Sequence, residues 1–214
     1  VYTQDVAGMQ EAAAVMCDDW DEDVDTPEEP TLGIPIGAYL DQVSDAGIDA
    51  FETHLDALIK AEYDIKMIEL FDDVETMYER HYTLMVSEGA LAHHKRHEAY
   101  TDGYSEELSD RIEQGREETV ETLARAREYQ ERFMTEIGEM MAEKEIDLWV
   151  CTTALGNAPE GLGDTGDASM NSAWTLEGRD AVSLPGGSVD GVPVGQQVIA
   201  DSGEAEKLLE WAEA

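Results

Sequence analysis

Basic residues are scarce in this chain, and their scarcity excludes whole classes of partner. The 214 residues include 13 lysines and arginines against 50 aspartates and glutamates, which gives a formal net charge of −37 at pH 7. Proteins that bind nucleic acid electrostatically neutralise its phosphates with basic side chains. A charge of the opposite sign argues against a nucleic-acid partner, and it equally disfavours contact with an anionic membrane surface.

Cysteine and long apolar runs are also in short supply. The two cysteines, Cys17 and Cys151, form neither a CxxC pair nor a disulfide framework, which fits a reducing compartment. No apolar run approaches the roughly 18 residues that a membrane-spanning helix needs. We therefore expect a cytoplasmic protein. No initiator methionine precedes Val1, so we also expect this chain to be a fragment of a longer protein.

Acidic residues, by contrast, are spread over every segment of the chain. Strong acidity alone would suggest a disordered or solvating tail, but 42% of the residues are hydrophobic, which favours a folded globule coated with carboxylates. Molar salt shortens the Debye length to about 3 Å and so suppresses repulsion between such carboxylates. We interpret the sequence as that of an acidic, halophilic protein.

Apolar periodicity predicts alternating strands and helices. We expect helices over 6–16, 45–60, 73–100, 105–144 and 204–214, and strands over 31–37, 64–70, 146–151, 181–184 and 194–200. The strand–helix–strand order at the start implies a right-handed crossover and parallel pairing. An unbroken helix over 105–144 would be about 60 Å long, so we expect a bend near Gly115. A coiled-coil stalk is the alternative for this segment.

The densest pattern lies in the last third of the chain. A strand and a glycine-rich loop are followed by a polar–aromatic block and by two strands that flank the turn Asp190-Gly191. The stretches TGDASMNSAWTLEGRDAVSLPGG (165–187) and DGVPVGQQVIA (190–200) resemble the closing part of the amidase signature family. Residues 178–180 read Gly-Arg-Asp where that family usually has Gly-Leu-Pro, and residues 151–154 lack its proline.

The resemblance implies a fold and a reaction. The implied fold class is α/β, a mixed β-sheet sandwiched by helices, with residues 1–214 as the C-terminal part of a single amidase-like domain whose sheet is incomplete. Enzymes of this family hydrolyse amides: a serine hydroxyl attacks the carbonyl, and an unprotonated lysine acts as base through a second serine. These three residues precede the matching blocks and have no counterpart here. We expect a small-molecule amide as substrate, no cofactor, and no turnover by this chain alone.

Two other functions stay open. The chain could belong to an amidotransferase A-type subunit, which shares the catalytic machinery and acts on aminoacyl-tRNA within a complex. It could instead be a non-catalytic interaction module derived from an amidase. An incomplete sheet exposes an unpaired edge, which favours aggregation or a partner. A homodimer is one candidate assembly.

Asn171, Trp174 and Thr175 are the predicted substrate-binding residues. They lie between a glycine-rich loop and a strand, where an α/β fold places ligand contacts. The resemblance implies that this block lines the substrate cleft, with Asn171 holding the loop or a substrate amide and Trp174 supplying an apolar wall. The alternative is that the three residues only seal the loop against the sheet.

Three further groups could carry chemistry, and each has a structural interpretation that fits better. Ser188 lies in a strand-to-strand turn with no base in prospect, so we expect a structural residue. His93 and His97 share a helical face, but the HExxH pattern of a zinc site is absent; we interpret them as a solvated face and expect no metal. Cys151 ends a buried strand and is expected to be a core thiol.

Overall fold

The structure is a computed structural model that describes residues 1–21, 24–25 and 29–213. Within these residues the chain divides into two compact units. One is formed by Val1–Asp72 together with Gly138–Ala214, and the other by Asp73–Ile137. No helix in the described residues is both long and apolar enough to cross a membrane. The first unit contains the sheet and the candidate site.

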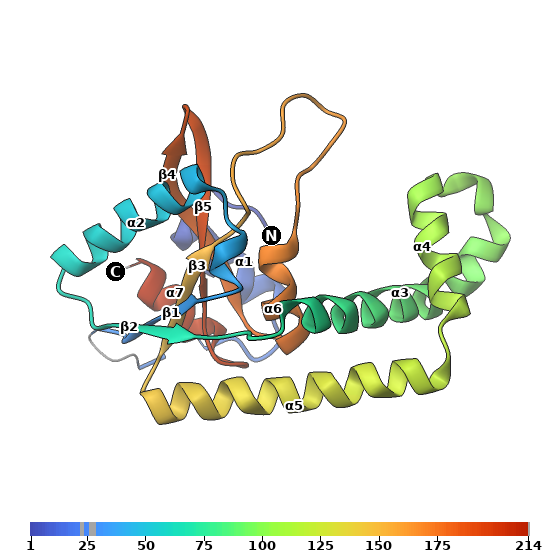
Figure 1. Cartoon of the computed structure of the whole chain (residues 1–214), viewed down its shortest axis with the longest axis horizontal. Helices are drawn as coiled ribbons and strands as arrows, with labels where there is room; N and C mark the ends of the chain where they lie inside the picture. The colour runs from blue at the N-terminus through green and yellow to red at the C-terminus, as the bar shows by residue number, and fades with distance from the viewer. Residues whose placement is uncertain (22–23, 26–28, 214) are drawn as a thin grey trace. The chain divides into compact units, whose positions relative to one another are not determined.

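Five strands of the described residues form one mixed sheet in the order β2-β1-β3-β5-β4 (Figure 1). They are β1 (Leu32–Ile36), β2 (Ile65–Glu69), β3 (Leu148–Thr152), β4 (Ala181–Val189) and β5 (Val192–Ile199). β1 is parallel to both β2 and β3, whereas β5 is antiparallel to β3 and β4. The predicted α/β class, the five strands and the parallel first pair are confirmed. β2 and β4 form the two edges of this sheet.

The two faces of the sheet are covered by different helices. All five residues of β3 are buried, as expected of a central strand that is covered on both sides. Leu148 and Val150 join one core cluster with Phe51 of α2 (Asp45–Lys60) and Leu208 of α7 (Ala205–Glu213). The alternate residue Trp149 packs against Trp174 of α6 (Ser169–Glu177), 6.2 Å between ring centroids. Successive side chains of a strand point to opposite faces, so α2 and α6 lie on opposite sides of the sheet.

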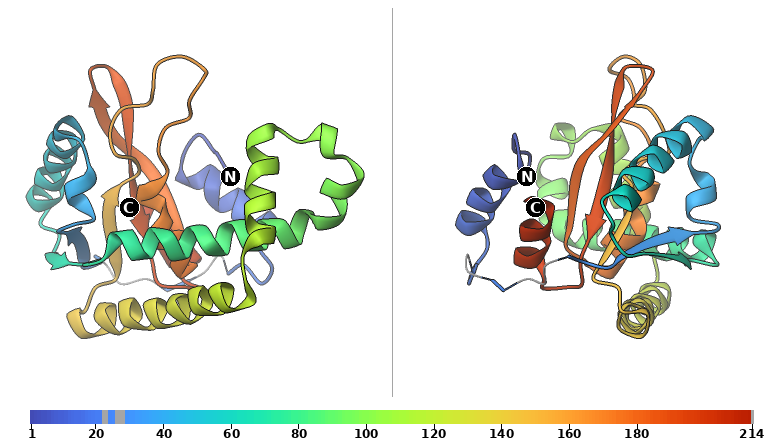
Figure 2. Two further views of the ribbon diagram at one scale, coloured as in Figure 1. Left: turned by 45° about the vertical axis from the view of Figure 1, so that its right-hand side comes forward. Right: turned by 90° about the vertical axis from the view of Figure 1, so that its left-hand side faces the viewer.

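Short polar caps fix where the first helices begin. Asp5 precedes α1 (Val6–Met16) and accepts a hydrogen bond from the Gly8 amide at 2.8 Å, and Ser44 caps α2 in the same way through Gly47. Both boundaries were predicted from the sequence. α1 lies beside α7 (Figure 2, right), and Gln10 donates to Glu210 between the two helices at 3.2 Å.

The β4–β5 hairpin is longer than the sequence predicted. The prediction ended the first strand before Pro185-Gly186-Gly187, but β4 continues to Val189, with an irregular register between Pro185 and Ser188. Proline is tolerated there because β4 is an edge strand and needs no amide donor on its outer side. The turn Asp190-Gly191 has φ of 52° and 80° and joins the paired residues Val189 and Val192, as in a tight hairpin.

The second unit corrects the predicted long helix. It contains α3 (Val74–Ala99), α4 (Glu106–Glu117) and the first part of α5 (Val120–Lys144), so the expected single helix over 105–144 is in fact two. The break falls at Glu118, whose ψ is 137°, and Thr119 then caps α5 through the Thr122 amide at 3.0 Å. Gly115 serves a different purpose from the expected bend. A Cβ at this position would lie 1.9 Å from the Val86 carbonyl oxygen, so the missing side chain lets α4 approach α3.

Candidate functional site

The polar–aromatic block of residues 170–175 forms most of helix α6, which the sequence analysis did not predict. Buried residues recur along α6 at helical spacing: Met170, Ala173, Trp174 and Glu177. Asp167 accepts a hydrogen bond from the Ser169 amide at 2.7 Å just before the first turn. The periodicity was readable in the sequence, but a buried glutamate at its end disguised it.

Trp174 is held inside the protein by Tyr39 and Phe71. Its Nε1 donates to the Tyr39 hydroxyl at 2.9 Å, and that hydroxyl donates in turn to the Met170 carbonyl at 2.5 Å. The Phe71 ring packs edge-on against both, at centroid distances of 5.0 Å from Tyr39 and 5.3 Å from Trp174. A buried indole with a satisfied N–H forms a rigid wall. Substrate contact by Trp174 stays a prediction.

The other two predicted contact residues lie on different sides of α6. Asn171 is half-buried, and its Nδ2 lies 3.5 Å from the Thr153 carbonyl oxygen, so it ties α6 to the loop after β3. Thr175 is exposed. The structure therefore places Asn171 against the loop after β3, Trp174 in the core and Thr175 at the surface.

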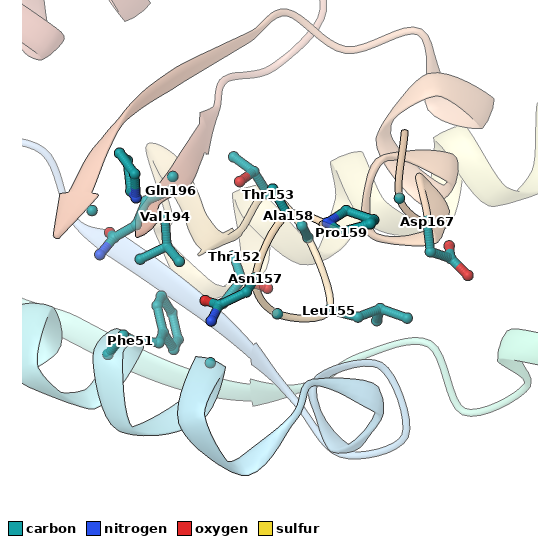
Figure 3. Close-up of a pocket in the computed structure, with 18 of the residues that line it drawn as sticks. Phe51, Thr152, Thr153, Leu155, Asn157, Ala158, Pro159, Asp167, Val194 and Gln196 are labelled. Carbon is teal, nitrogen blue, oxygen red and sulfur yellow. The ribbon is translucent and has the colours of Figure 1, made fainter. Parts of the chain in front are cut away.

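A cavity of about 580 Å³ lies at the carboxyl end of β3. Its walls come from α2, from the loop 153–167 and from the β4–β5 hairpin (Figure 3). Among its lining residues are Phe51, Thr152, Asn157, Pro159, Val194 and Gln196. Both its position and its volume are typical of ligand sites in α/β proteins. Asn171, Trp174 and Thr175 do not line it.

The charged residues that line this cavity are all acidic. The lining contains Asp164 and Asp167 and, among the described residues, no lysine, arginine or histidine. Asp164 accepts a hydrogen bond from the Gly166 amide within this loop, and Asp167 accepts one from the Ser169 amide at the start of α6. Hydrogen bonding from Ser169 lowers the pKa of Asp167, so its carboxylate is charged at neutral pH. An anionic ligand would be repelled here.

Thr152 and Gln196 stand out because they are polar, buried and unpaired. They are cross-strand partners in the β3–β5 register and are 6% and 3% exposed. Neither the Thr152 hydroxyl nor either amide atom of Gln196 has a hydrogen-bond partner among the described residues. Leaving a buried polar group unpaired costs about 1–3 kcal/mol. A Cβ at Gly186 would lie 2.7 Å from Gln196 Cγ, so the glycine makes room for this side chain.

The neighbouring glutamine has a different role. Gln197 points to the α6 face, where its Nε2 donates to the carbonyl oxygens of Thr152 at 3.0 Å and Met170 at 2.9 Å. It therefore fixes α6 to β3. The sequence analysis missed both glutamines as separate features. The available signal was the alternation Val194, Gln196, Val198, in which one polar residue interrupts an apolar face.

An ionic cluster of Glu177, Arg179 and Asp201 lies where the sequence departs from the family pattern at residues 178–180. Arg179 Nε donates to Glu177 Oε2, and its Nη1 donates to Asp201 Oδ1 at 2.6 Å. Burial raises the pKa of Glu177 to about 7, although the nearby guanidinium acts in the opposite direction. The second carboxyl oxygen of Glu177 has no partner among the described residues. None of these three residues lines the cavity.

Cys151 behaves as its structural interpretation predicted, whereas Ser188 lies within strand β4 and not in the strand-to-strand turn where it was expected. Ser188 is exposed in β4, in register with Pro193. Cys151 is fully buried beside the Tyr39 hydroxyl, 3.5 Å away, and burial raises the pKa of its thiol to about 12. Such a thiol stays protonated and is a poor nucleophile.

The interpretation of the histidine pair as a solvated face is wrong for His97. That residue is buried against the Tyr104 ring, and its Nδ1 lies 3.6 Å from Glu113 Oε1. His93 Nδ1 lies 2.9 Å from the Tyr104 hydroxyl. The described residues contain no cluster of three or more histidine, cysteine or acidic side chains that could hold a metal ion.

Comparison with solved structures relates this fold to enzymes that act on amides. The chain is similar to an amidase (TM-score 0.86, 21% identity, 98% of this chain and 50% of that one). It is also similar to a bacterial aryl acylamidase of the amidase signature family (0.69, 12%, 86% and 42%) and to Kluyveromyces lactis allophanate hydrolase (0.70, 16%, 98% and 37%). No protein-family model matches the sequence, and a search of curated proteins gives no match.

These likenesses concern the fold. The chain spans half the length of the solved amidase and less of the other two structures. The predicted resemblance to amidase signature enzymes is thereby confirmed for the architecture of this chain.

Proposed function

We propose that this chain is the C-terminal, substrate-cleft portion of an amide hydrolase, and that residues 1–214 belong to one amidase-like domain. The observation that carries the proposal is the match of 98% of the chain to half of a solved amidase at a TM-score of 0.86. The blocks at 165–187 and 190–200, which suggested the same family from sequence, supply α6 and the β4–β5 hairpin. Fold alone does not establish an activity, so the proposal rests secondly on the cavity and the residues around it.

The proposed reaction is acyl transfer to a serine. The serine oxygen forms a bond to the amide carbonyl carbon, while its proton passes through a second serine to an unprotonated lysine. Backbone N–H groups stabilise the resulting oxyanion. The C–N bond then breaks as the departing amine takes up a proton, and water hydrolyses the acyl-enzyme to the acid. The nucleophile, the relay serine and the lysine would come from the half of the fold that this chain does not cover.

The residues of this chain would position the substrate rather than attack it. The cavity opens at the carboxyl end of β3, and its loop is tied to α6 through Asn171 and the Thr153 carbonyl. Trp174, on the same helix, attaches α6 to the core through its hydrogen bond to the Tyr39 hydroxyl. Of the three predicted contact residues, we propose Asn171 as the best placed to meet a substrate. We propose Trp174 as the rigid wall behind it.

The edges of the sheet support a partner segment. In the described residues β2 pairs only with β1, and β4 pairs only with β5, so the outer backbone groups of both strands are unpaired (Figure 1). Further strands or a second copy of the chain would satisfy them.

Both cysteines are free, Cys17 exposed and Cys151 buried, in keeping with the proposed cytoplasmic location.

The experiment is to read the gene upstream of the Val1 codon, express the whole reading frame, and measure ammonia release from a panel of small amides. We expect an upstream lysine and a Gly/Ser-rich segment, hydrolysis by the longer protein, and loss of hydrolysis when the serines of that segment are changed to alanine. The 214-residue chain alone should not turn over. Turnover by this chain alone would refute the proposed division of roles.

The same experiment separates the alternatives. A start codon at Val1 with no catalytic segment would favour a non-catalytic interaction module. Activity that requires aminoacyl-tRNA and partner subunits would favour an amidotransferase A-type subunit.

A further inference from the structure

We infer that Thr152 and Gln196 form a recognition subsite of the cavity, which binds an uncharged group presenting a hydrogen-bond donor beside an acceptor, as in a primary carboxamide, and which rejects a carboxylate. The inference rests on the proposed function only in taking this cavity to be the substrate site. It adds the residues that select the ligand and the chemical class that they select.

The first argument is the set of unused hydrogen-bonding atoms. The Gln196 amide offers Nε2 as donor and Oε1 as acceptor side by side, and the Thr152 hydroxyl can do either. All three atoms are buried without a partner among the described residues, and both side chains line the cavity. A carboxamide presents the complementary pair to the glutamine, so it can satisfy the donor and the acceptor together.

The second argument is the way that the fold places these two side chains. Thr152 and Gln196 are directly opposite each other on β3 and β5, so they face the same side of the sheet at neighbouring positions. Gly186 on β4 leaves space for Gln196, because a side chain there would meet its Cγ at 2.7 Å. The adjacent Gln197, by contrast, uses its Nε2 in two hydrogen bonds to the backbone on the other face. The fold therefore secures one glutamine and leaves the other unsatisfied beside a cavity.

The third argument is charge. The cavity wall carries Asp164 and Asp167 without a described basic residue, on a chain of net charge −37. A carboxylate ligand could accept from Gln196 Nε2, but it would be repelled by these aspartates and would leave Oε1 unpaired. A neutral amide avoids both penalties. Phe51, Pro159 and Val194 supply apolar surface for the remainder of the ligand.

The test uses the 214-residue chain and three ligands of nearly equal shape: benzamide, acetophenone and benzoate. Acetophenone keeps the carbonyl acceptor but lacks the donor, and benzoate replaces the amide by a charged group. Binding is followed by ¹⁵N–¹H NMR of the glutamine side-chain amides at one fixed KCl concentration. We expect benzamide to shift the Gln196 signals saturably and to bind at least about tenfold more tightly than either analogue, as expected for a buried group left unpaired.

Two variants and a control locate the subsite. Gln196→Leu and Thr152→Val should each weaken benzamide binding about tenfold, because each removes hydrogen-bonding atoms while keeping a similar volume. Ser188→Ala, on an exposed residue of β4 that does not line the cavity, should leave binding unchanged. Equal binding of benzoate or acetophenone to the unaltered chain overturns the inference, whether or not the variants fold. Unshifted Gln196 signals also overturn it.

Failure of this inference can be told apart from failure of the proposed function. Benzamide binding is measured on the chain alone and needs no turnover, whereas hydrolysis is measured on the longer reading frame. Binding without hydrolysis in the longer protein would leave the subsite standing and remove the enzyme. Hydrolysis without binding at Gln196 would do the reverse.

Discussion

Arg179 Nη1 donates to Oδ1 of Asp201 at 2.6 Å, which links the end of α6 to the segment after β5. The Arg179 side chain is 3% exposed and also donates to the fully buried carboxylate of Glu177. Loss of Arg179 would leave the buried Glu177 carboxylate with neither water nor a charged partner, whereas Asp201 is half-exposed and keeps its hydration.

The first prediction concerns Arg179→Met, which keeps most of the side-chain length and removes the charge. We expect the free energy of unfolding to fall by about 3–5 kcal/mol, measured by urea denaturation at pH 7.5. The matched control is Arg111→Met, on a half-exposed arginine that pairs with Glu107 at 2.6 Å. Its loss should cost under about 1 kcal/mol. Equal effects of the two substitutions would contradict the structural role of the cluster.

The second prediction follows from the pKa of Glu177, which burial raises from 4.5 to about 7. The folded protein therefore holds this proton more tightly than the unfolded chain, so the stabilisation is present below pH 4.5 and is lost as the pH rises to 7. A shift of this size corresponds to about 3 kcal/mol at most. Glu177→Gln resembles the protonated state, so it should remove this part of the pH dependence.

The measurement for Glu177 is the difference in unfolding free energy between the two proteins from pH 4.5 to 8. That difference isolates one group from the many exposed carboxylates that both proteins share. We expect Glu177→Gln to gain stability relative to the unaltered chain as the pH rises. A constant difference across this range would show that Glu177 titrates normally.

The third prediction concerns the contact of α3 with α4. Gly115→Ala would place a Cβ 1.9 Å from the Val86 carbonyl oxygen, so the helices must separate. We expect a loss of about 3 kcal/mol or more from such overpacking. Gly89→Ala is the control, because its Cβ would meet nothing within 4 Å. As a helix-interior glycine, Gly89 should give a gain of up to about 1 kcal/mol on substitution.

The fourth prediction concerns Trp174→Phe, which removes the hydrogen bond to Tyr39 but keeps an aromatic ring. The tyrosine hydroxyl retains the Met170 carbonyl as acceptor, so the expected cost is about 1–3 kcal/mol of stability, measured by thermal unfolding. If Trp174 is a wall behind the cavity, benzamide affinity should change less than twofold. A large loss of affinity with unchanged stability would instead make Trp174 a direct ligand contact.

Local patterns predicted most of the fold. The cap at Ser44, the apolar pattern of α3 and the buried run of β3 set those element boundaries to within about two residues, because each signal is contained in neighbouring positions. The break at Glu118 could not be read in this way. Residues 118 and 119 are neither glycine nor proline, so no helix-breaking residue marks the break. Gly115 resembles a helix-breaking residue, but its missing side chain instead makes room for the Val86 carbonyl oxygen of α3.

The candidate site was less predictable than the fold. The sequence analysis predicted a substrate contact within residues 171–175, which belong to helix α6 in the structure. The cavity lies beside Thr152 and Gln196, which are 44 positions apart and become neighbours only through the antiparallel pairing of β3 with β5. The alternation Val194, Gln196, Val198 assigns the two glutamines to opposite faces, but whether a buried glutamine is satisfied depends on such pairing, so no local pattern shows which of the two is unsatisfied.

The last prediction concerns salt. The chain carries 50 acidic residues against 13 basic ones, and most carboxylates are on the surface, so repulsion among them opposes the folded state at low ionic strength. Raising KCl from about 0.1 M to 3 M shortens the Debye length from about 10 Å to below 3 Å, which screens this repulsion. We expect the melting temperature to rise steadily over that range. The control is NaCl at equal concentration, which should act similarly if screening is the cause. A flat or falling melting temperature would remove the interpretation of this protein as salt-adapted.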